Sequence, residues 1–322
     1  MSISIAVIVF VLSCAGLAYA GGILVRSISR MADFLGWKEF TVSFIVMSCA
    51  TALPELFVGI SSALRGVPEL SFGNIIGQSI IHFTVAVAVC VIVGGAFRVD
   101  SAVVRTSAWF SSFMAVLPIL LIVDHRLSRI DGVLLIMSFL FYMAWGFSRR
   151  HTFSKTFDRK GEYPASFFGK IRSSMRDITG LIFGIAIILL SAQGIISSTV
   201  TFASYLNLPL VIVGALIVGL GTSLPEMYFS AISAKENKKA LMLGNLLGST
   251  AVSVSMVLGV VAIIQPIVIV DLSPYFIGRV CLLASVIFFL IFMSTGRKIT
   301  IREGAFLLFI YFAFVLSEAF LN

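Results

Sequence analysis

Two glutamates stand inside strongly apolar stretches of this 322-residue chain, and nearly the same residues surround both. Glu55 ends the sequence ATALPE and Glu226 ends the sequence GTSLPE. GNIIG begins 18 residues after the first glutamate and GNLLG begins 18 residues after the second, so the whole pattern recurs at an offset of 171 without a gap. A carboxylate held away from water needs a cation, a proton or a set of hydrogen-bond donors. The duplicated pattern therefore predicts that these two carboxylates form a functional site.

Oxygen-bearing side chains accompany both carboxylates at helical spacing. Residues four apart share one face of a helix, and four such pairs occur in the two copies: Thr51 with Glu55, Thr222 with Glu226, Gln78 with His82, and Ser249 with Ser253. Oxygen ligands suit a hard cation such as Ca²⁺ or Na⁺, and no cysteine stands on these faces to favour a soft metal. No Lys or Arg lies near either glutamate in sequence, so a mobile cation is the simplest partner.

Other roles for these residues stay open at the level of the sequence. A serine or threonine in a membrane helix often hydrogen-bonds to its own backbone, and a single buried glutamate can be a protonated structural donor. Two glutamates duplicated together with their polar neighbours favour a site instead. His82 has two interpretations: a neutral hydrogen-bond donor to Glu55 or to a backbone carbonyl, or a proton-sensitive member of the site, since imidazole titrates near neutral pH.

The composition places these residues in a lipid bilayer. Hydrophobic residues make up 59% of the chain and charged residues 12%, with a mean hydropathy of +1.08. A helix that crosses roughly 30 Å of hydrocarbon needs about 20 apolar residues. We therefore predict ten transmembrane helices, and we interpret the first as a span rather than a signal peptide because it lacks a basic leading segment. The apolar runs cover residues 3–25, 40–64, 70–95, 102–123, 130–147, 179–203, 209–234, 240–267, 275–294 and 303–320.

Basic residues indicate which ends of the spans face the cytoplasm. Nineteen of the 23 Lys and Arg residues lie at the connections after the odd-numbered spans. Positive charge is retained on the cytoplasmic side, so both termini are expected outside, in the plasma membrane of a prokaryote. The net charge of +8 is then a topology signal, and no nucleic-acid partner is expected. The expected partners are the lipid bilayer and inorganic cations, with no obligatory protein partner.

Five spans per half is an odd number, so the second half must enter the membrane from the opposite face. We expect an all-α polytopic protein of two inverted five-helix repeats, residues 1–147 and 179–322, joined by a basic cytoplasmic linker over residues 148–178. Pro54 and Pro225 should break their spans beside the glutamates, and the motif glycines should loosen the spans that follow. A shared site is expected at the midplane, where the broken helices of the two halves meet.

The duplicated GTSLPE and GN-x-x-GS elements resemble the alpha repeats of the cation/calcium exchanger superfamily, most closely those of the prokaryotic sodium/calcium exchangers. The resemblance covers the repeat architecture of the whole chain, and its specific motifs span about residues 48–82 and 219–253. In that family the two glutamates bind the transported ions together with hydroxyls, main-chain carbonyls one turn earlier and side chains of the following span. The implied ligands are Glu55, Glu226, Thr51, Thr222, Ser223 and Ser249, with the main-chain oxygens of Ser48 and Gly219.

The two copies differ at positions that should matter for ion preference. The pairs that differ are Ala52 with Ser223, Gln78 with Ser249, and His82 with Ser253. At the last pair the resembled exchangers usually carry asparagine in the first repeat and aspartate in the second. A site without that aspartate has fewer anions and should neutralise less cation charge. The sodium stoichiometry of the family is therefore not assumed for this chain.

We expect a secondary active antiporter that exchanges Ca²⁺, or a similar divalent cation, against Na⁺ by alternating access at the two glutamates. The alternative keeps the fold and couples divalent transport to protons through His82 and the glutamates. From other classes, an intramembrane enzyme has little support because the chain lacks HExxH and GxSxG motifs. A passive cation channel fits two inverted copies less well than alternating access does. No enzymatic activity and no cofactor are expected.

Overall fold

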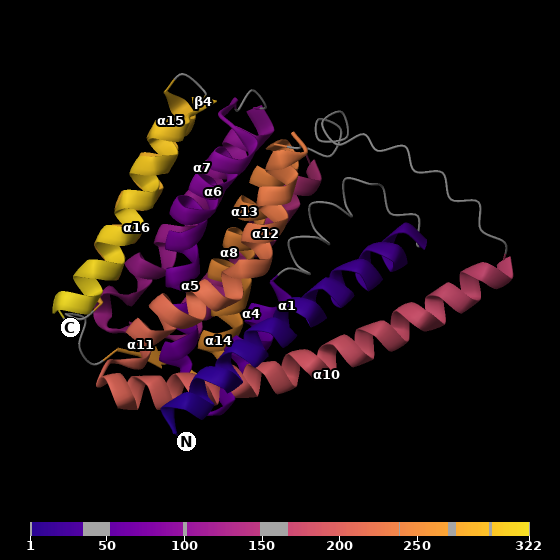
Figure 1. Cartoon of the computed structure of the whole chain (residues 1–322), viewed down its shortest axis with the longest axis horizontal. Coiled ribbons are helices and arrows are strands. Elements are labelled where there is room, and N and C mark those ends of the chain that lie inside the picture. Colours follow the sequence, from indigo (N-terminus) through magenta and orange to yellow (C-terminus); the bar gives the residue numbers. More distant parts are fainter. Residues whose placement is uncertain are drawn as a thin grey trace.

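The computed structural model describes residues 2–34, 52–98, 102–148, 167–237, 239–269, 275–295 and 298–321. Nearly all of these residues are helical, and each of the strands contains only two residues, so the prediction of an all-α fold is confirmed. The helices form one bundle in which segments from both halves of the chain lie side by side (Figure 1).

The first half contains five helices or helical units among the described residues. They are α1 (Ile3–Phe34), α4 (Leu53–Leu64), the continuous unit α5 (Pro68–Ile81), η2 (His82–Ala86) and α6 (Val87–Gly94), then α7 (Ala102–Leu121) with the 3-10 turn η3 (Ile122–Asp124), and α8 (Arg129–Ser148). The segment η2 is a π-helical turn. Strands β1 (Phe97–Arg98) and β2 (Arg126–Leu127) flank α7.

The second half repeats this order. It contains α10 (Phe167–Leu206), the unit α11 (Leu210–Val213), η4 (Gly214–Val218) and α12 (Gly219–Lys235), the unit α13 (Lys239–Val252), η5 (Ser253–Val257) and α14 (Leu258–Ile264), then α15 (Phe276–Ser294) and α16 (Ile301–Leu321). Both η4 and η5 are π-helical turns. Strands β3 (Ile267–Val268) and β4 (Lys298–Ile299) flank α15.

Every one of the ten predicted runs contains a helix, although only the part from Ala52 onward of the run 40–64 lies among the described residues. Six helices in those residues are long and apolar enough to cross a membrane, and a seventh is added if a bent pair counts as one span. Helix α10 begins at Phe167 rather than at 179, so the expected linker over 148–178 becomes helical before its end. Its first turns carry charged residues that have high helix propensity and can extend a helix beyond the hydrocarbon.

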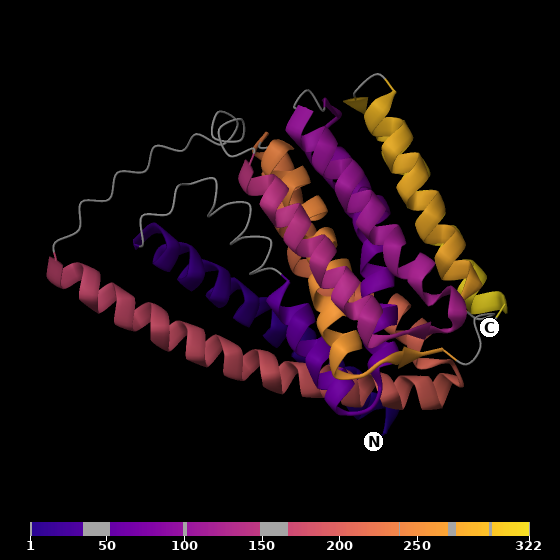
Figure 2. The same cartoon turned by 180° about the vertical axis from the view of Figure 1, so that it is seen from behind.

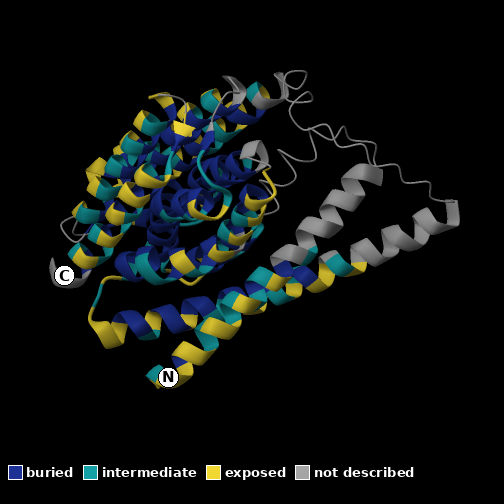
Figure 3. Cartoon of the chain, turned by 45° about the horizontal axis from the view of Figure 1, so that its top comes forward, coloured by how far each residue is buried: buried dark blue, intermediate teal, exposed yellow. Residues whose placement is uncertain are grey.

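The distribution of buried and exposed residues is that of a protein in a bilayer and not of a protein in water. The units α5–η2–α6 and α13–η5–α14 lie at the centre, with 89% and 78% of the residues in their most apolar 18-residue stretches buried. Large apolar side chains point outward from the surrounding helices, for example Leu12 at 67% and Leu190 at 74% exposure. Figure 3 shows this pattern, with buried residues inside the bundle and exposed residues along its outer helices. An apolar surface of this extent is stable against lipid.

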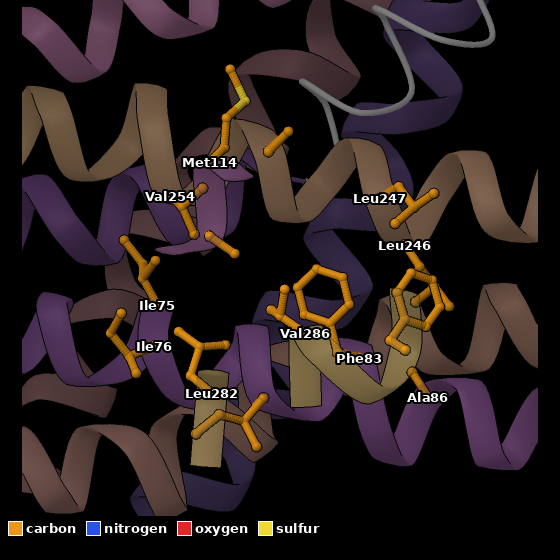
Figure 4. Close-up of a cluster of buried hydrophobic side chains, with 14 of the residues drawn as sticks. Ile75, Ile76, Phe83, Ala86, Met114, Leu246, Leu247, Val254, Leu282 and Val286 are labelled. Atoms are coloured by element: carbon orange, nitrogen blue, oxygen red, sulfur yellow. The ribbon is translucent and has the colours of Figure 1, made fainter. Parts of the chain in front are cut away.

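An apolar cluster joins the two halves around the central units. Ile75, Ile76 and Phe83 from the first half pack with Leu246, Leu247, Val254, Leu282 and Val286 from the second half (Figure 4). Helices α1 and α10, the first helix of each half, pack against each other along one edge of the bundle (Figures 1 and 2). Each repeat therefore depends on the other for its buried surface.

Two small sheets show the inverted relation of the halves. Strand β1 pairs antiparallel with β4, and β2 pairs antiparallel with β3, so each sheet joins one half to the other. Because α7 runs from β1 to β2, the sheets lie at opposite ends of the bundle. The π-helical turns η2 and η5 begin at residues 82 and 253, which differ by the same offset of 171 as the motifs.

Candidate cation site

Glu55 lies in the first turn of α4, where Ala52 is the N-cap residue and Pro54 occupies the start of the helix. Proline is accepted there because the first N–H groups of a helix have no intrahelical partner. The positive end of the helix dipole also favours a carboxylate at this place. The predicted break beside Glu55 thus corresponds to a helix start, and its effect is to direct unpaired N–H groups towards the acid.

Glu226 lies at a bend of its span. The helical segments Leu210–Leu224 and Glu226–Lys235 meet at an angle of 48°. The predicted interruption next to the second glutamate is therefore confirmed as a bend, while α12 stays helical on both sides of it. Since α12 packs against α5 and α13, the bend brings Glu226 to the centre of the bundle.

Both glutamates are buried, and each is only 1% exposed. They are close enough to repel each other electrostatically, and in the part of the chain that the structure describes neither has an ion pair with a basic residue. Oε2 of Glu55 and Oε2 of Glu226 are buried and have no hydrogen-bond partner. Two buried acids with unpartnered oxygens are unstable as anions unless a cation or a proton compensates them.

Neutral oxygens extend this arrangement. Gln78 on α5 donates its amide Nε2–H to Oε1 of Glu55 at 3.0 Å, and its own Oε1 is buried without a donor. The Ser253 hydroxyl, at the start of η5, is also buried without a partner. The described residues contain no group of three or more His, Cys, Asp or Glu that could hold a metal ion. A divalent cation at the two carboxylates would therefore need neutral oxygens to complete its coordination shell.

The hydroxyls of α12 keep their lone pairs available. Ser223 donates to the main-chain oxygen of Gly219 at 2.6 Å. Thr222 donates towards Oδ1 of Asn74 at 3.0 Å and towards the main-chain oxygen of Val218 at 3.1 Å. A hydroxyl has one hydrogen and two lone pairs, so a hydroxyl that donates to the protein can still bind a cation through its oxygen.

Some of the remaining predicted ligands lie among the described residues, and two lie outside them. Ser249 is buried and donates weakly to the main-chain oxygen of Leu246 at 3.3 Å. The main-chain oxygen of Gly219 accepts hydrogen bonds from Ser223 and Thr222, so it lies beside the site hydroxyls. Ala52 is buried and adds no oxygen from its side chain. Ser48 and Thr51 lie outside the described residues.

His82 has a different partner from the one expected. Its Nδ1 lies 2.8 Å from the Thr250 hydroxyl, which itself donates to the main-chain oxygen of Leu246 at 2.7 Å. The expectation of a bond to Glu55 or to a carbonyl is therefore wrong, because the ring bonds to Thr250 of the other half. Since the Thr250 hydrogen is already used, Nδ1 must carry the proton that joins the two side chains. Nε2 is buried without a partner and faces an apolar gap lined by Phe83, Leu243 and Phe289.

In the first repeat the motif glycines Gly73 and Gly77 have a packing role instead of loosening their span. Helix α5 is continuous through Gly73 and Gly77. A Cβ atom at Gly73 would overlap the carbonyl of Val211, and one at Gly77 would lie 2.5 Å from Cα of Ala215. The backbone of α5 therefore touches the backbone of α11 and η4. This close approach places Thr222, on the following helix α12, within hydrogen-bond distance of Asn74 on the other half. The span is altered one turn later, at η2, and π-helical turns of this kind occur frequently at functional sites.

Asn74 and Thr250 take part in the site network although the sequence reasoning did not select them as site residues. Asn74 accepts from Thr222, and its counterpart Asn245 donates to Ser230 at 3.2 Å. The signal for Asn74 was present, because it is the polar residue of the duplicated GNIIG motif. Nothing in the sequence pairs Thr250 with His82, since the residues are 168 positions apart and belong to different halves.

Two related halves that cross the membrane in opposite directions, with broken or bent helices and buried acids where they meet, define a membrane transporter of the inverted-repeat class. Residues 5–147 and residues 177–319 each match the sodium/calcium exchanger protein family. The chain belongs to this family, and it is therefore an integral membrane cation antiporter and not an enzyme.

Individual relatives and solved structures agree with this assignment. The chain is 23% identical to the sodium/calcium exchanger MaX1 of Methanosarcina acetivorans, over 90% of this chain and 92% of that protein. It is 26% identical to the inner membrane protein YrbG of Escherichia coli, over 85% and 84%. Among solved structures, the H⁺/Ca²⁺ exchanger CAX is similar with a TM-score of 0.78 at 14% identity, over 97% of this chain and 82% of that chain. The sodium-calcium exchanger NCX_Mj is similar with a TM-score of 0.64 at 23% identity, over 100% of both chains. These likenesses establish the fold of ten transmembrane helices in two inverted repeats.

Proposed function

We propose that this chain exchanges Ca²⁺, or a similar divalent cation, against Na⁺ at the site formed by Glu55 and Glu226. The observation that carries the proposal is a set of buried oxygens with no donor: Oε2 of both glutamates, Oε1 of Gln78 and Oγ of Ser253. They stand on α4, α5 and η5, which pack against one another, and on α12, which packs against α5. Acceptors without donors are the expected lining of a cation site whose ligand is the transported ion.

The names of similar proteins support the choice of ions. MaX1 is named a sodium/calcium exchanger, and the NCX_Mj structures are described as those of a sodium-calcium exchanger. A site with two carboxylates and several neutral oxygens suits Ca²⁺, which accepts six to eight oxygen ligands in flexible geometry. Thr222, Ser223, Ser249 and the main-chain oxygen of Gly219 are the further ligands that we propose in the second repeat.

We further propose that one group of helices slides past the rest to expose the site to either face in turn. Helices α1 and α10 are the candidates for the moving group, because they pack extensively on each other at the edge of the bundle. None of the strands in the two small sheets adjoins α1 or α10 in the chain. The strands flank α7 and α15 and connect these two helices at both ends. Saturable counterflow of labelled Ca²⁺ tests this mechanism, because a passive channel would not show it.

The direct test is uptake of radioactive Ca²⁺ into proteoliposomes under an outward Na⁺ gradient with the pH clamped. Glu55→Gln and Glu226→Gln should each abolish uptake while the protein stays folded, because the neutral amide has nearly the same shape and can hydrogen-bond. Glu236→Gln, at an exposed position after α12, is the matched control and should transport normally. Wild-type uptake by both site variants would refute the site.

The second candidate is exchange against protons. It is favoured by the similarity to the H⁺/Ca²⁺ exchanger CAX and by the absence of an aspartate at the position of Ser253. In this case the glutamates themselves would take the protons, because His82 is tied to Thr250 and has no bond to either acid. Ca²⁺ uptake driven by a pH gradient in the absence of Na⁺ would establish this coupling, and uptake under a Na⁺ gradient alone would exclude it.

The topology and the division of the chain are also proposals. The bias of 19 of 23 basic residues supports both termini outside. The similarity to proteins of Methanosarcina acetivorans and Escherichia coli supports the plasma membrane of a prokaryote. The two family matches support repeats over residues 1–147 and 179–322, with residues 148–178 as the cytoplasmic connection. Single cysteines at positions 2 and 321, labelled in intact cells by a membrane-impermeant maleimide, test the orientation. Labelling only after lysis would contradict it.

A further inference from the structure

One contact distinguishes the first glutamate from the second. The amide of Gln78 donates to Oε1 of Glu55 at 3.0 Å, and both residues are 1% exposed. The counterpart of Gln78 in the second repeat is Ser249, whose hydroxyl instead donates to the main-chain oxygen of Leu246. An N–H group on a carboxylate oxygen uses a lone pair that would otherwise bind a cation. Oε2 of Glu55 is the oxygen of this carboxylate that has no hydrogen-bond partner.

Gln78 also adds no charge at a position directly beside the acids. Its free Oε1 is a neutral ligand, and the other polar residues around the glutamates are neutral hydroxyls and an amide. The buried acids among the described residues are Glu55, Glu226 and Glu318. Glu318 lies in the last turns of α16, away from the two glutamates, with Oε1 next to Gly278 in the first turn of α15. The central site therefore holds two negative charges.

A buried site that carries two negative charges is neutral with two positive charges and with no other number. A third monovalent cation would leave a net charge in surroundings of low dielectric, where an uncompensated charge costs several kcal/mol. It would also need oxygen ligands, and the amide N–H of Gln78 already takes one lone pair of a carboxylate oxygen. The charge sets the limit of two, and the bond from Gln78 favours it by leaving one lone pair fewer for a third cation.

We propose that Gln78 restricts the site to two positive charges, so that one divalent cation exchanges for two monovalent cations without net movement of charge. This inference rests on the proposed function, since it concerns the same two glutamates. Gln78 is on this basis the residue that sets the coupling ratio. Its neutral amide stands next to Glu55, where an acid would add a third negative charge.

The test measures the steady-state accumulation of radioactive Ca²⁺ in proteoliposomes while a membrane potential is imposed with K⁺ gradients and valinomycin. If one net charge moved in each cycle, a potential of about 100 mV would supply about 2.3 kcal/mol and change the accumulation ratio about 50-fold. We expect a change of less than about twofold for the wild-type protein under a fixed Na⁺ gradient, or under a fixed pH gradient if protons drive uptake.

Gln78→Glu should make accumulation depend on the potential by tens-fold, because the new acid admits a third monovalent cation. Gln265→Glu, the same change at the end of α14 and outside the site, should leave accumulation insensitive to the potential. If Gln78→Glu does not transport, Ser253→Asp supplies the third acid at the other repeat and should give the same dependence. Potential-insensitive transport by every active acidic variant would overturn the role of Gln78.

The outcomes separate the inference from the function on which it rests. Absence of Ca²⁺ uptake by the wild-type protein under either gradient contradicts the proposed function. Wild-type uptake that follows the membrane potential about 50-fold per 100 mV contradicts the inference alone.

Discussion

Replacement of Gly77 by alanine tests the backbone contact that positions the site. The new Cβ would lie 2.5 Å from Cα and 2.6 Å from the carbonyl carbon of Ala215, and it would overlap the carbonyl oxygen. Carbon atoms normally approach to about 3.5–4.0 Å, so α5 and η4 must separate by roughly 1 Å. Because the atoms in the way are main chain, no side chain can rotate to relieve the overlap.

The magnitude follows from two opposing effects. Alanine is better than glycine inside a helix by about 1 kcal/mol, whereas overpacking against a rigid neighbour costs about 3 kcal/mol. The net loss of about 2 kcal/mol corresponds to a fall in Tm of roughly 3 °C for a chain of this size. Ca²⁺ uptake should fall as well, because Asn74 lies on α5 and its partner Thr222 lies on α12, which directly continues η4.

Gly304→Ala is the matched control. A Cβ at Gly304 would meet Cα of Ala88 at 3.4 Å and Val91 at 3.5 Å, which are ordinary contacts at most slightly tight. The free energy of unfolding should stay the same or rise by up to about 1 kcal/mol, and the Tm should follow it. Thermal unfolding of the purified protein in detergent, followed by tryptophan fluorescence, measures both variants. Equal Tm values for Gly77→Ala and Gly304→Ala would refute the close approach of the two halves.

Three further predictions concern the site. His82→Asn should leave the pH profile of Ca²⁺ uptake unchanged, because the ring bonds to Thr250 and to neither acid; a displaced profile would return His82 to the ion site. Thr222→Val keeps the side-chain shape and removes the hydroxyl between Asn74 and the proposed ion. A loss of about 0.5–1.5 kcal/mol should raise the Ca²⁺ concentration for half-maximal uptake roughly two- to thirteenfold, and an unchanged value would remove Thr222 from the ligands. Ca²⁺ at about 100 times its Kd should stabilise the wild-type protein by about 2.7 kcal/mol, seen as a higher Tm, and the double variant Glu55→Gln with Glu226→Gln should show no such gain.

Much of the architecture was predictable because membrane insertion imposes simple rules on sequence. Apolar runs of about 20 residues must be helices, since backbone polar groups in lipid need internal partners. The bend beside Glu226 was predictable from Pro225 for a similar local reason. The role of Gly77 was not, because a glycine within a helix fits both a loosened span and a close contact until the neighbouring helix is known.

At the site, the sequence identifies the two acids, whereas only the structure shows which side chains bond to one another. Glu55 and Glu226 stand out in the sequence because acids in apolar runs are costly and these two are duplicated. The partner of His82 was predicted wrongly, because sequence spacing relates residues on one helix only, and Thr250 belongs to the other repeat. The bond between Gln78 and Glu55 likewise joins two helices and depends on how α5 packs against α4.

The sequence by itself determined that this protein crosses the membrane as two inverted repeats and that each repeat buries one carboxylate, because the cost of polar groups in hydrocarbon leaves few alternatives. Only the tertiary structure decided which neutral groups meet those carboxylates. That choice depends on contacts of a few ångströms between helices from different halves, where Gln78 binds Glu55 while Ser249 binds its own backbone. Such contacts follow from packing and not from periodicity, so the difference between the two halves of the site becomes visible only in the folded chain.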